Sequence, residues 1–530
     1  MLVSGPAGPG EQTGVWVLSA TGGALRKLAG GAWGAVPSPD GSQIAFRRPP
    51  GTEIWLLSAA GGQPRRLVSA SPGYWFEEAL AWSPDGRRIA YLKRNEPGDD
   101  LVLESFDLDT SRHTLILSEP RMRDFCWARD GRVIYARMEG PPLETSTNLW
   151  EIRTDPRTAQ PRGRPRRLTN WAGFQLSYLG ISADGRRMAF TRNRSHSDVY
   201  VGELESRGMR LAAPRRLTFD ERVDWPTGWT RDSQGVLFYS DRNGEVDIFR
   251  QGVMTREAQA VVTGPEEKRD ARESPDGRWI LYLAWPKVDG QVRTGEGRLK
   301  RVPVSGGRPE VIFSVTGYPG PARITTDRGF TMRITGHPRF RCPSVPQAPC
   351  VLGELVQRQV VFTAFDPVEG RKGELARIEI DPSICSFWDL SPDGRWIAFG
   401  KREEASGRIR LLPLAGQAPR EISAGGRTHL EQAAWAPDGK ALFVTGWASS
   451  GPPLLRVSLD GATHLLYKGR YYIENPVPSP DGRYLAFGEM TFESNAWVIE
   501  KSNGAPVGLG GLLATHAGHV EGGHTTTTTR

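Results

Sequence analysis

One short pattern recurs along the chain and restricts its possible folds more than any other feature. Residues 81–94 read AWSPDGRRIAYLKR, in which a Pro-Asp-Gly segment separates two apolar runs. Adjacent copies lie 43–54 residues apart, except for one gap of 117 residues. A repeat of this period is typical of solenoids, propellers and arrays. The nine copies carry their aspartates at Asp40, Asp85, Asp130, Asp184, Asp232, Asp276, Asp393, Asp438 and Asp481.

The motif suits a tight turn between two antiparallel strands. Pro84 restricts φ, the Asp85 carboxylate can accept a hydrogen bond from the backbone N–H two residues on, and Gly86 tolerates a positive φ. A calcium loop would need several oxygen ligands at alternating positions, whereas each copy offers one carboxylate. A phosphate loop would need glycines and a lysine that open a helix, whereas a strand follows here. We therefore interpret the aspartates as structural turn residues.

Each copy is followed by two further strand-like runs, such as EIWLLSA at 53–59 and RRLV at 65–68. Four strands in about 45 residues match one blade of a β-propeller. The composition agrees, because the chain has 62 glycines and 41 prolines among its 530 residues. The sequence therefore predicts an all-β fold, a β-propeller built from four-stranded antiparallel blades.

The repeat spacing also predicts how the chain divides. In the long gap, FRCPSVPQAPCVLGE at 340–354 replaces the turn motif of one further blade, which gives about ten blades. Rings usually have four to eight blades, so two tandem propellers are favoured over one large ring. The predicted parts are a flexible N-terminus at 1–13, a first propeller at 14–285, a second at 286–501 with an irregular insertion at 314–338, and a disordered tail at 502–530.

The two ends of the repeat array are incomplete. GVWVLSA at 14–20 and LRKL at 25–28 look like the third and fourth strands of a blade that lacks its first two. The last blade lacks an obvious fourth strand. Either the N-terminal strands complete the final blade, or the chain is the tail of a longer protein; both interpretations stay open.

The hairpin W-S-P-D-G-x-x-I-A-F resembles the TolB-type, WD-like propeller repeat over residues 14–501. A narrower resemblance, carried by 148–174, RRLTFDERVDWP at 215–226, 340–354 and TFESNAW at 491–497, is to C-terminal propeller modules of bacterial serine/threonine protein kinases and winged-helix regulators. This resemblance implies a sensing or docking module. The kinase motifs, including the glycine-rich ATP loop and the H-R-D loop, do not occur in the sequence.

No complete catalytic motif is present. The nucleophile elbow G-x-S-x-G is missing, and so is the sialidase-type Asp box. We therefore expect a chain that is not an enzyme, a scaffold without a cofactor or metal that recognises a protein or a small ligand. The alternative is a hydrolase or lactonase with a site in the central channel, since sequence cannot show which side chains converge there.

Histidines and cysteines supply the remaining candidate sites. His516, His519 and His524 could ligate a metal, but they lie in a Gly/Thr-rich segment that favours a disordered tail. Cys342 and Cys350 flank a proline-rich loop, where either a disulfide or two free thiols would fit; the disulfide requires a location outside the cytoplasm. The other two cysteines, Cys126 and Cys385, are expected to be buried small hydrophobes.

The net charge of +8 comes from basic pairs such as Arg65-Arg66 and Arg87-Arg88 that are spread along the chain. Spread charge indicates a solvated surface, so we do not expect nucleic acid as a partner. The sequence has no apolar run of 18 residues and no signal peptide. We expect a cytoplasmic protein, or an extracytoplasmic one if the chain is the tail of a membrane-anchored kinase.

Overall fold

A computed structural model describes residues 2–5, 13–18, 26–95, 101–139, 146–182, 184–220, 222–288, 291–292, 297–317, 321–325, 331–335, 338–345, 348–380, 386–401, 407–425, 429–448, 451–470, 472–501 and 512–519. This part of the chain consists of β-strands and one short 3-10 turn, and contains no α-helix. It divides into two compact units. Unit 1 is Met1–Arg194 with Glu493–Arg530, and unit 2 is Ser195–Phe492.

In the described residues, unit 2 contains six blade sheets and two short hairpins, and five of the blade sheets are four-stranded. Their strands are β20 (Asp224–Trp229), β21 (Gly235–Ser240), β22 (Asp247–Gly252) and β23 (Gln259–Val262); β24 (Glu267–Glu273), β25 (Trp279–Trp285), β28 (Gly297–Pro303) and β29 (Glu310–Val315); β32 (Arg339–Arg341), β33 (Cys350–Val356), β34 (Gln359–Asp366) and β35 (Gly370–Glu379); β36 (Ser386–Leu390), β37 (Trp396–Lys401), β38 (Arg408–Pro413) and β39 (Arg420–Ser423); and β40 (His429–Trp435), β41 (Ala441–Trp447), β42 (Pro453–Ser458) and β43 (Thr463–Lys468).

The sixth sheet joins the two ends of unit 2. β44 (Tyr472–Pro478) and the first part of β45 (Tyr484–Lys501) come from its end, whereas the second part of β17 (Arg187–Glu205) and β19 (Arg215–Arg216) come from its start. β44 packs beside β20, so the first strand of the last sheet meets the first strand of the first sheet. Hydrogen bonds between distant segments therefore close a six-bladed ring.

Unit 1 has five sheets in the described residues. Their first strands β1, β4, β8, β12 and β16 pack beside one another in that order. The strands are β1 (Leu2–Gly5), β2 (Gly14–Val17) and β3 (Arg26–Gly30); β4 (Trp33–Pro37), β5 (Gln43–Arg48), β6 (Glu53–Ser58) and β7 (Arg65–Ser69); β8 (Tyr74–Trp82), β9 (Arg88–Asn95), β10 (Leu101–Asp107) and β11 (His113–Ser118); β12 (Met122–Trp127), β13 (Arg132–Met138), β14 (Thr147–Thr154) and β15 (Pro161–Arg167); and β16 (Gln175–Ile181), β17, β45 and β46 (Leu512–His519).

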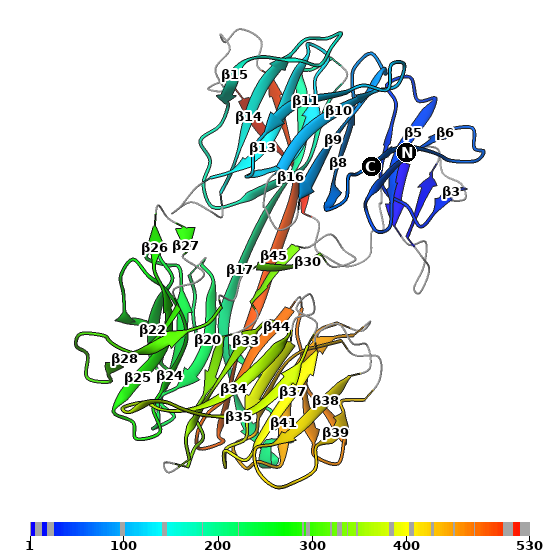
Figure 1. Cartoon of the computed structure of the whole chain (residues 1–530). Coiled ribbons are helices and arrows are strands. Elements are labelled where there is room, and N and C mark those ends of the chain that lie inside the picture. Colours follow the sequence, from blue (N-terminus) through cyan, green and yellow to red (C-terminus); the bar gives the residue numbers. More distant parts are fainter. Residues whose placement is uncertain are drawn as a thin grey trace. The chain divides into compact units, whose positions relative to one another are not determined.

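Two long strands take part in both units. β17 pairs with β16 over its first residues and with β19 near its end, while β45 pairs with β44 at its start and with β46 at its end. β17 and β45 also pair with each other and run side by side as the longest strands in Figure 1. One seven-stranded sheet thus contains a blade of each unit.

The fold class predicted from the repeat is confirmed, but the division of the chain differs. The predicted boundary after residue 285 falls inside one sheet, because β25 pairs with β28 across it. Two short hairpins occupy long connections, β26 (Lys287–Val288) with β27 (Gln291–Val292), and β30 (Pro321–Thr325) with β31 (Thr331–Thr335), the latter inside the predicted irregular insertion.

The predicted ends differ as well. The N-terminus at 1–13 was expected to be flexible, but Leu2–Gly5 forms β1 and pairs with β2. The tail at 502–530 was expected to be disordered, but Leu512–His519 forms β46 and pairs with β45. The rest of that tail lies outside the described residues. The N-terminal strands form a sheet of their own, so they do not complete the final blade.

The turn motif has the same geometry in all nine copies. Asp85 Oδ1 accepts hydrogen bonds from the backbone N–H of Arg87 at 3.1 Å and from the Ser83 hydroxyl at 2.6 Å. The residue after each aspartate has a positive φ of 58–79°, which glycine adopts without strain. The equivalent N–H bonds in the nine copies measure 3.0–3.2 Å and involve Asp40, Asp85, Asp130, Asp184, Asp232, Asp276, Asp393, Asp438 and Asp481.

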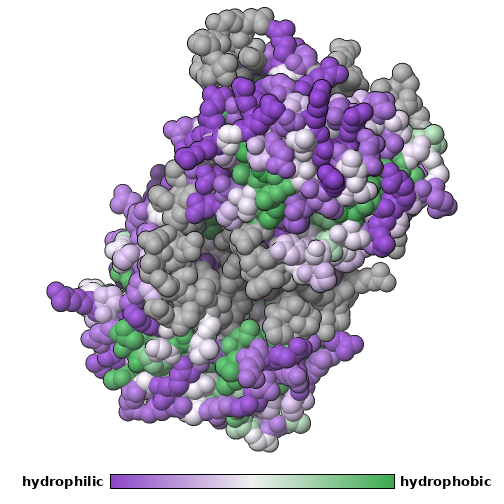
Figure 2. Space-filling model, turned by 45° about the horizontal axis from the view of Figure 1, so that its top comes forward, coloured by the Kyte–Doolittle hydropathy of each residue, from purple (hydrophilic) through white to green (hydrophobic). Residues whose placement is uncertain are grey.

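The blades are held together by apolar packing and by a recurring tryptophan bond. The Trp82 indole N–H donates to the Val36 carbonyl of the preceding blade at 3.1 Å, and Trp229 donates to Val477 at 2.8 Å. Both tryptophans lie three residues before a turn aspartate. On the face shown in Figure 2, hydrophilic side chains cover most of the described surface, and the hydrophobic ones form separate patches. The described apolar surface is therefore mainly buried between blades.

Candidate ligand site at the centre of unit 2

Four of the six first strands of unit 2, β20, β24, β40 and β44, carry a register shift close to the position six residues before the turn aspartate. In β24 the pairing with β25 shifts between Arg269 and Arg272, and Asp270, six residues before its turn aspartate, has φ +52°. In β44 the equivalent residue Asn475 has φ +47°. A bulge redirects side chains out of the sheet. Here the Asp270 carboxylate reaches the next blade and accepts the backbone N–H of Phe340 at 3.0 Å.

Arg341 connects three neighbouring blades. Its Nη1 lies 3.0 and 3.1 Å from the two carboxylate oxygens of Asp270, and its Nε donates to Asp389 at 2.7 Å. The other Asp389 oxygen accepts the backbone N–H of Trp435 at 2.8 Å. The blade of Arg341 is the one whose first strand has only three residues and no Asp-Gly turn. The ion pairs therefore anchor the shortest first strand to both of its neighbours.

The charges of Arg341 and Asp270 compensate each other. Burial alone would lower the pKa of Arg341, but the attraction of Asp270 and Asp389 raises it overall. Burial alone would raise the pKa of Asp270, but Arg341, Arg272 and Arg339 lower it overall. Both groups stay ionised at neutral pH, and their side chains are only 12% and 14% exposed.

Arg272 is compensated much less well. Its Nε lies 3.6 Å from Asp270, beyond hydrogen-bond distance, and this buried nitrogen has no hydrogen-bond partner in the described ranges. Burial, followed by repulsion from Arg341, lowers its pKa to about 10. Its side chain is 22% exposed. We call Asp270, Arg272, Arg339, Arg341 and Asp389 the axial cluster; it holds three cations and two anions.

A disulfide secures the loop beside Arg341. Cys342, the next residue, is bonded to Cys350 at the start of β33, with a Cα–Cα distance of 4.1 Å. The bonded loop stands where other blades have the Asp-Gly turn. The Ser344 N–H donates to the Pro392 carbonyl in the turn of the next blade at 2.9 Å. The disulfide thus closes the hairpin that positions Arg341.

Unit 1 has a smaller polar cluster, which is built around the position six residues before a turn aspartate. Asp124, six residues before its turn aspartate, accepts backbone N–H groups of Phe125 and Leu179 at 2.7 and 2.8 Å. Burial nevertheless raises its pKa to about 6. Glu78 is an exposed residue, but partial burial of its carboxyl group raises its pKa as well. The pKa of the neighbouring Tyr178 is also raised, first by partial burial of its hydroxyl group and then by the charges of Glu78 and Asp124.

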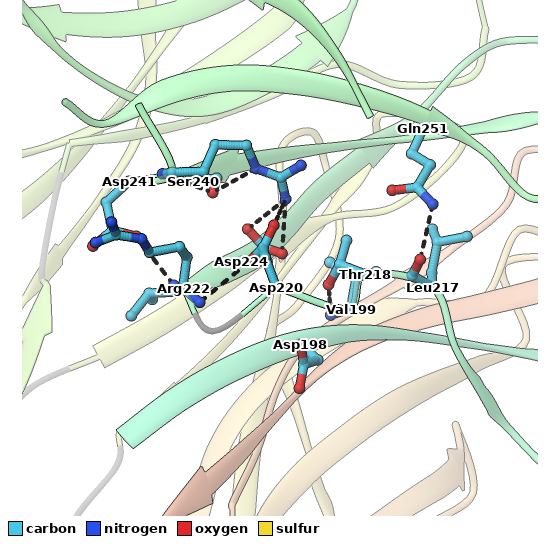
Figure 3. Close-up of polar contacts among 12 residues, drawn as sticks. Asp198, Val199, Leu217, Thr218, Asp220, Arg222, Asp224, Ser240, Asp241 and Gln251 are labelled. Atoms are coloured by element: carbon cyan, nitrogen blue, oxygen red, sulfur yellow. Dashed lines mark hydrogen bonds and ion pairs between the residues drawn. The ribbon is translucent and has the colours of Figure 1, made fainter. Parts of the chain in front are cut away.

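A third polar network lies at the start of the first blade of unit 2 (Figure 3). Arg242 donates to both Asp224 oxygens at 3.0 and 2.9 Å and also pairs with Asp220 at 2.7 Å. The neighbouring Asp198 pairs with Arg216 at 2.6 Å, although burial raises its pKa to about 7. Because arginines hold these carboxylates, we assign the network to anchoring the connection between β19 and β20.

The residues predicted from sequence do not converge on one site. The nine turn aspartates each lie at their own hairpin tip, with their own backbone partner. Cys126 is buried, and burial raises its pKa to about 12, whereas Cys385 lies outside the described residues. The side chains of His516 and His519 and all of His524 also lie outside. No group of three potential metal ligands occurs in the part of the chain that the structure describes.

Sequence reasoning missed the axial cluster. Asp270 and Asp124 both lie six residues before a turn aspartate, where other copies have residues such as Gly34 and Ala79. An alignment of the copies would have exposed this variable position. Arg341 could not be found in this way, because its blade lacks the motif.

Comparisons with known proteins bear on the fold. No protein-family model matches the chain. An uncharacterized protein of Agrobacterium fabrum is 30% identical over 217 residues, 40% of this chain and 64% of that protein. The chain therefore spans less than two thirds of this relative's length. Similar solved structures include TolB from Acinetobacter baumannii, 15% identical over 66% of this chain and 64% of that one, with a TM-score of 0.21.

Enzymes are also among the similar structures. Oligogalacturonate lyase from Vibrio parahaemolyticus is 13% identical over 72% of this chain and 87% of its own, with a TM-score of 0.29. A puromycin hydrolase is 14% identical over 68% of this chain and 56% of its own, with the same TM-score. The fold is that of TolB-type and related propellers, and such propellers occur in enzymes as well. The prediction that the chain is not an enzyme, made from absent motifs, is therefore wrong.

One further expectation concerns membranes. Among the described residues, no helix reaches the length and apolarity that a membrane-spanning helix needs.

Proposed function

We propose that this double propeller is a recognition module that binds a ligand at the axial cluster of unit 2. The carrying observation is Arg272, whose Nε is buried without a hydrogen-bond partner among the described residues and whose nearest carboxylate, Asp270, lies 3.6 Å away. Buried charges in proteins are normally paired, because an unpaired one loses its hydration without compensation. A ligand that pairs with Arg272 would remove this cost. The ligand is a small molecule or a terminal segment of a protein.

Two further features support a role in bacterial signalling outside the cytoplasm. The sequence resemblance is to propeller modules attached to bacterial kinases and regulators, where the propeller senses or docks. The Cys342–Cys350 disulfide is a bond that persists in oxidising compartments. Together they support a sensing or docking propeller that works outside the cytoplasm, with its signalling domain supplied by another part of the same protein.

Native mass spectrometry tests the proposed binding. The purified chain is incubated with a small-molecule extract of bacterial cells, desalted and measured beside two variants. We expect the wild type to retain at least one small molecule that Arg272→Gln loses. Arg278→Gln is the matched control, because Arg278 lies at the hairpin tip of the same blade with a side chain 74% exposed. Identical bound masses on wild type and Arg272→Gln would refute ligand binding at the axial cluster.

A further inference from the structure

We infer that the ligand of the axial cluster carries a monocarboxylate group, which the guanidinium of Arg272 binds. This inference rests on the proposed function and deepens it by naming the ligand class. It depends on three features of the described residues: the unsatisfied Nε of Arg272, the charge balance around it, and the way the backbone accommodates its side chain.

The Nε–H donor of Arg272 is available. A guanidinium has five N–H donors in a fixed plane. The Nε–H of Arg272 is buried and has no hydrogen-bond partner in the described ranges. Asp270, its nearest carboxylate, is 3.6 Å away and is already held by Arg341 and the Phe340 N–H. The planar fork of a guanidinium matches the two oxygens of a carboxylate. A carboxylate would use the Nε–H donor that the described residues leave unused.

The charge balance selects a monoanion. After burial, the charged groups with the largest effect on the pKa of Arg272 are Arg341, Asp270, Asp389 and Arg339. Together with Arg272 they sum to one excess positive charge, which one carboxylate would neutralise. A dianion such as sulfate would leave an excess negative charge beside Asp270 and Asp389, in a site where burial strengthens repulsion.

The backbone leaves room for the Arg272 side chain. Gly228, on the first strand of the preceding blade, lies against it. A Cβ at Gly228 would lie 3.5 Å from Arg272 Cγ and only 3.0 Å from the Ala271 carbonyl. The lack of a side chain at Gly228 and the bulge at Arg269–Arg272 together let Arg272 project beside Asp270 rather than into the sheet.

The test uses small probes on the full chain. Acetate and butanoate are compared with the neutral butanamide and with sulfate, at constant ionic strength, by isothermal titration calorimetry and by the midpoint of thermal unfolding. We expect saturable binding of both carboxylates that raises the midpoint, and no effect of butanamide. Arg272→Gln should abolish the binding, Arg272→Lys should weaken it at least about tenfold because the fork is lost, and Arg278→Gln should leave it unchanged.

The outcomes separate this inference from the proposed function. If Arg272→Gln loses the ligand from the bacterial extract but no carboxylate binds, the recognition function stands and the carboxylate class is refuted. Tighter binding of sulfate than of acetate would also refute the class. If carboxylates shift the midpoint of Arg272→Gln as much as that of the wild type, the effect is a general ion effect and the inference fails. If neither the extract nor any carboxylate yields binding, both proposals fail.

Discussion

At the scale of single residues, Asp124 shows that a carboxyl group can accept hydrogen bonds and still have a raised pKa. Its oxygens accept two backbone N–H groups, which favour ionisation, but burial outweighs them and raises its pKa from 3.8 to about 6. The folded state therefore binds this proton more tightly than the unfolded state does. The stability that this group contributes is fully present below about pH 4 and is lost as the pH rises to about 6.

Asp124→Asn should remove this pH dependence. We expect the free energy of unfolding of the wild type to fall, relative to that of the variant, between pH 4 and pH 6, and the difference to stay constant above pH 7. Urea unfolding of both proteins across this pH range measures it, with Asp109→Asn, whose side chain is 69% exposed, as the control. A difference that grows in the opposite direction would show that Asp124 is paired more strongly than its surroundings indicate.

At the scale of elements, the blade that begins with β32 shows how an ion pair can replace a turn. Arg341→Gln would leave the carboxylates of Asp270 and Asp389 without their cation in a mostly buried site. Removing one partner of a buried pair costs about 3–5 kcal/mol. We expect a loss of that size in urea unfolding, whereas Arg272→Gln should leave the free energy of unfolding unchanged or raise it. Equal losses in both variants would contradict the distinction between Arg341, which hydrogen-bonds to both carboxylates, and Arg272, which does not.

At the scale of the whole molecule, the closing sheet of unit 2 decides which segment can fold alone. Residues 195–492 contain both halves of that sheet, β44 with the start of β45, and the end of β17 with β19. We expect this segment to unfold in one cooperative transition by calorimetry and circular dichroism. Residues 14–285, the first domain that repeat spacing predicts, contain β17 without β45, and β24–β25 without β28 and β29. They should show a broader transition of lower enthalpy, and comparable cooperativity would contradict the assigned units.

The sequence by itself determined the blade. Asp85 specifies its turn through hydrogen bonds to residues two positions away, and Gly86 through its positive φ. The motif therefore forms the same turn wherever it occurs. The alternation of apolar residues after the turn then specifies the strands. These interactions are local, and for this reason the all-β propeller class could be read from the repeat alone.

Only the tertiary structure decided which strands close the ring of unit 2 and which side chains meet in the axial cluster. β17 and β45 are almost 300 residues apart, and neither segment has a sequence pattern that predicts pairing with the other. Arg341, Asp270 and Asp389 come from three blades and meet because the ring brings first strands together. Ring closure and the axial cluster depend on contacts between distant residues, and those contacts arise from packing of whole blades rather than from any local pattern.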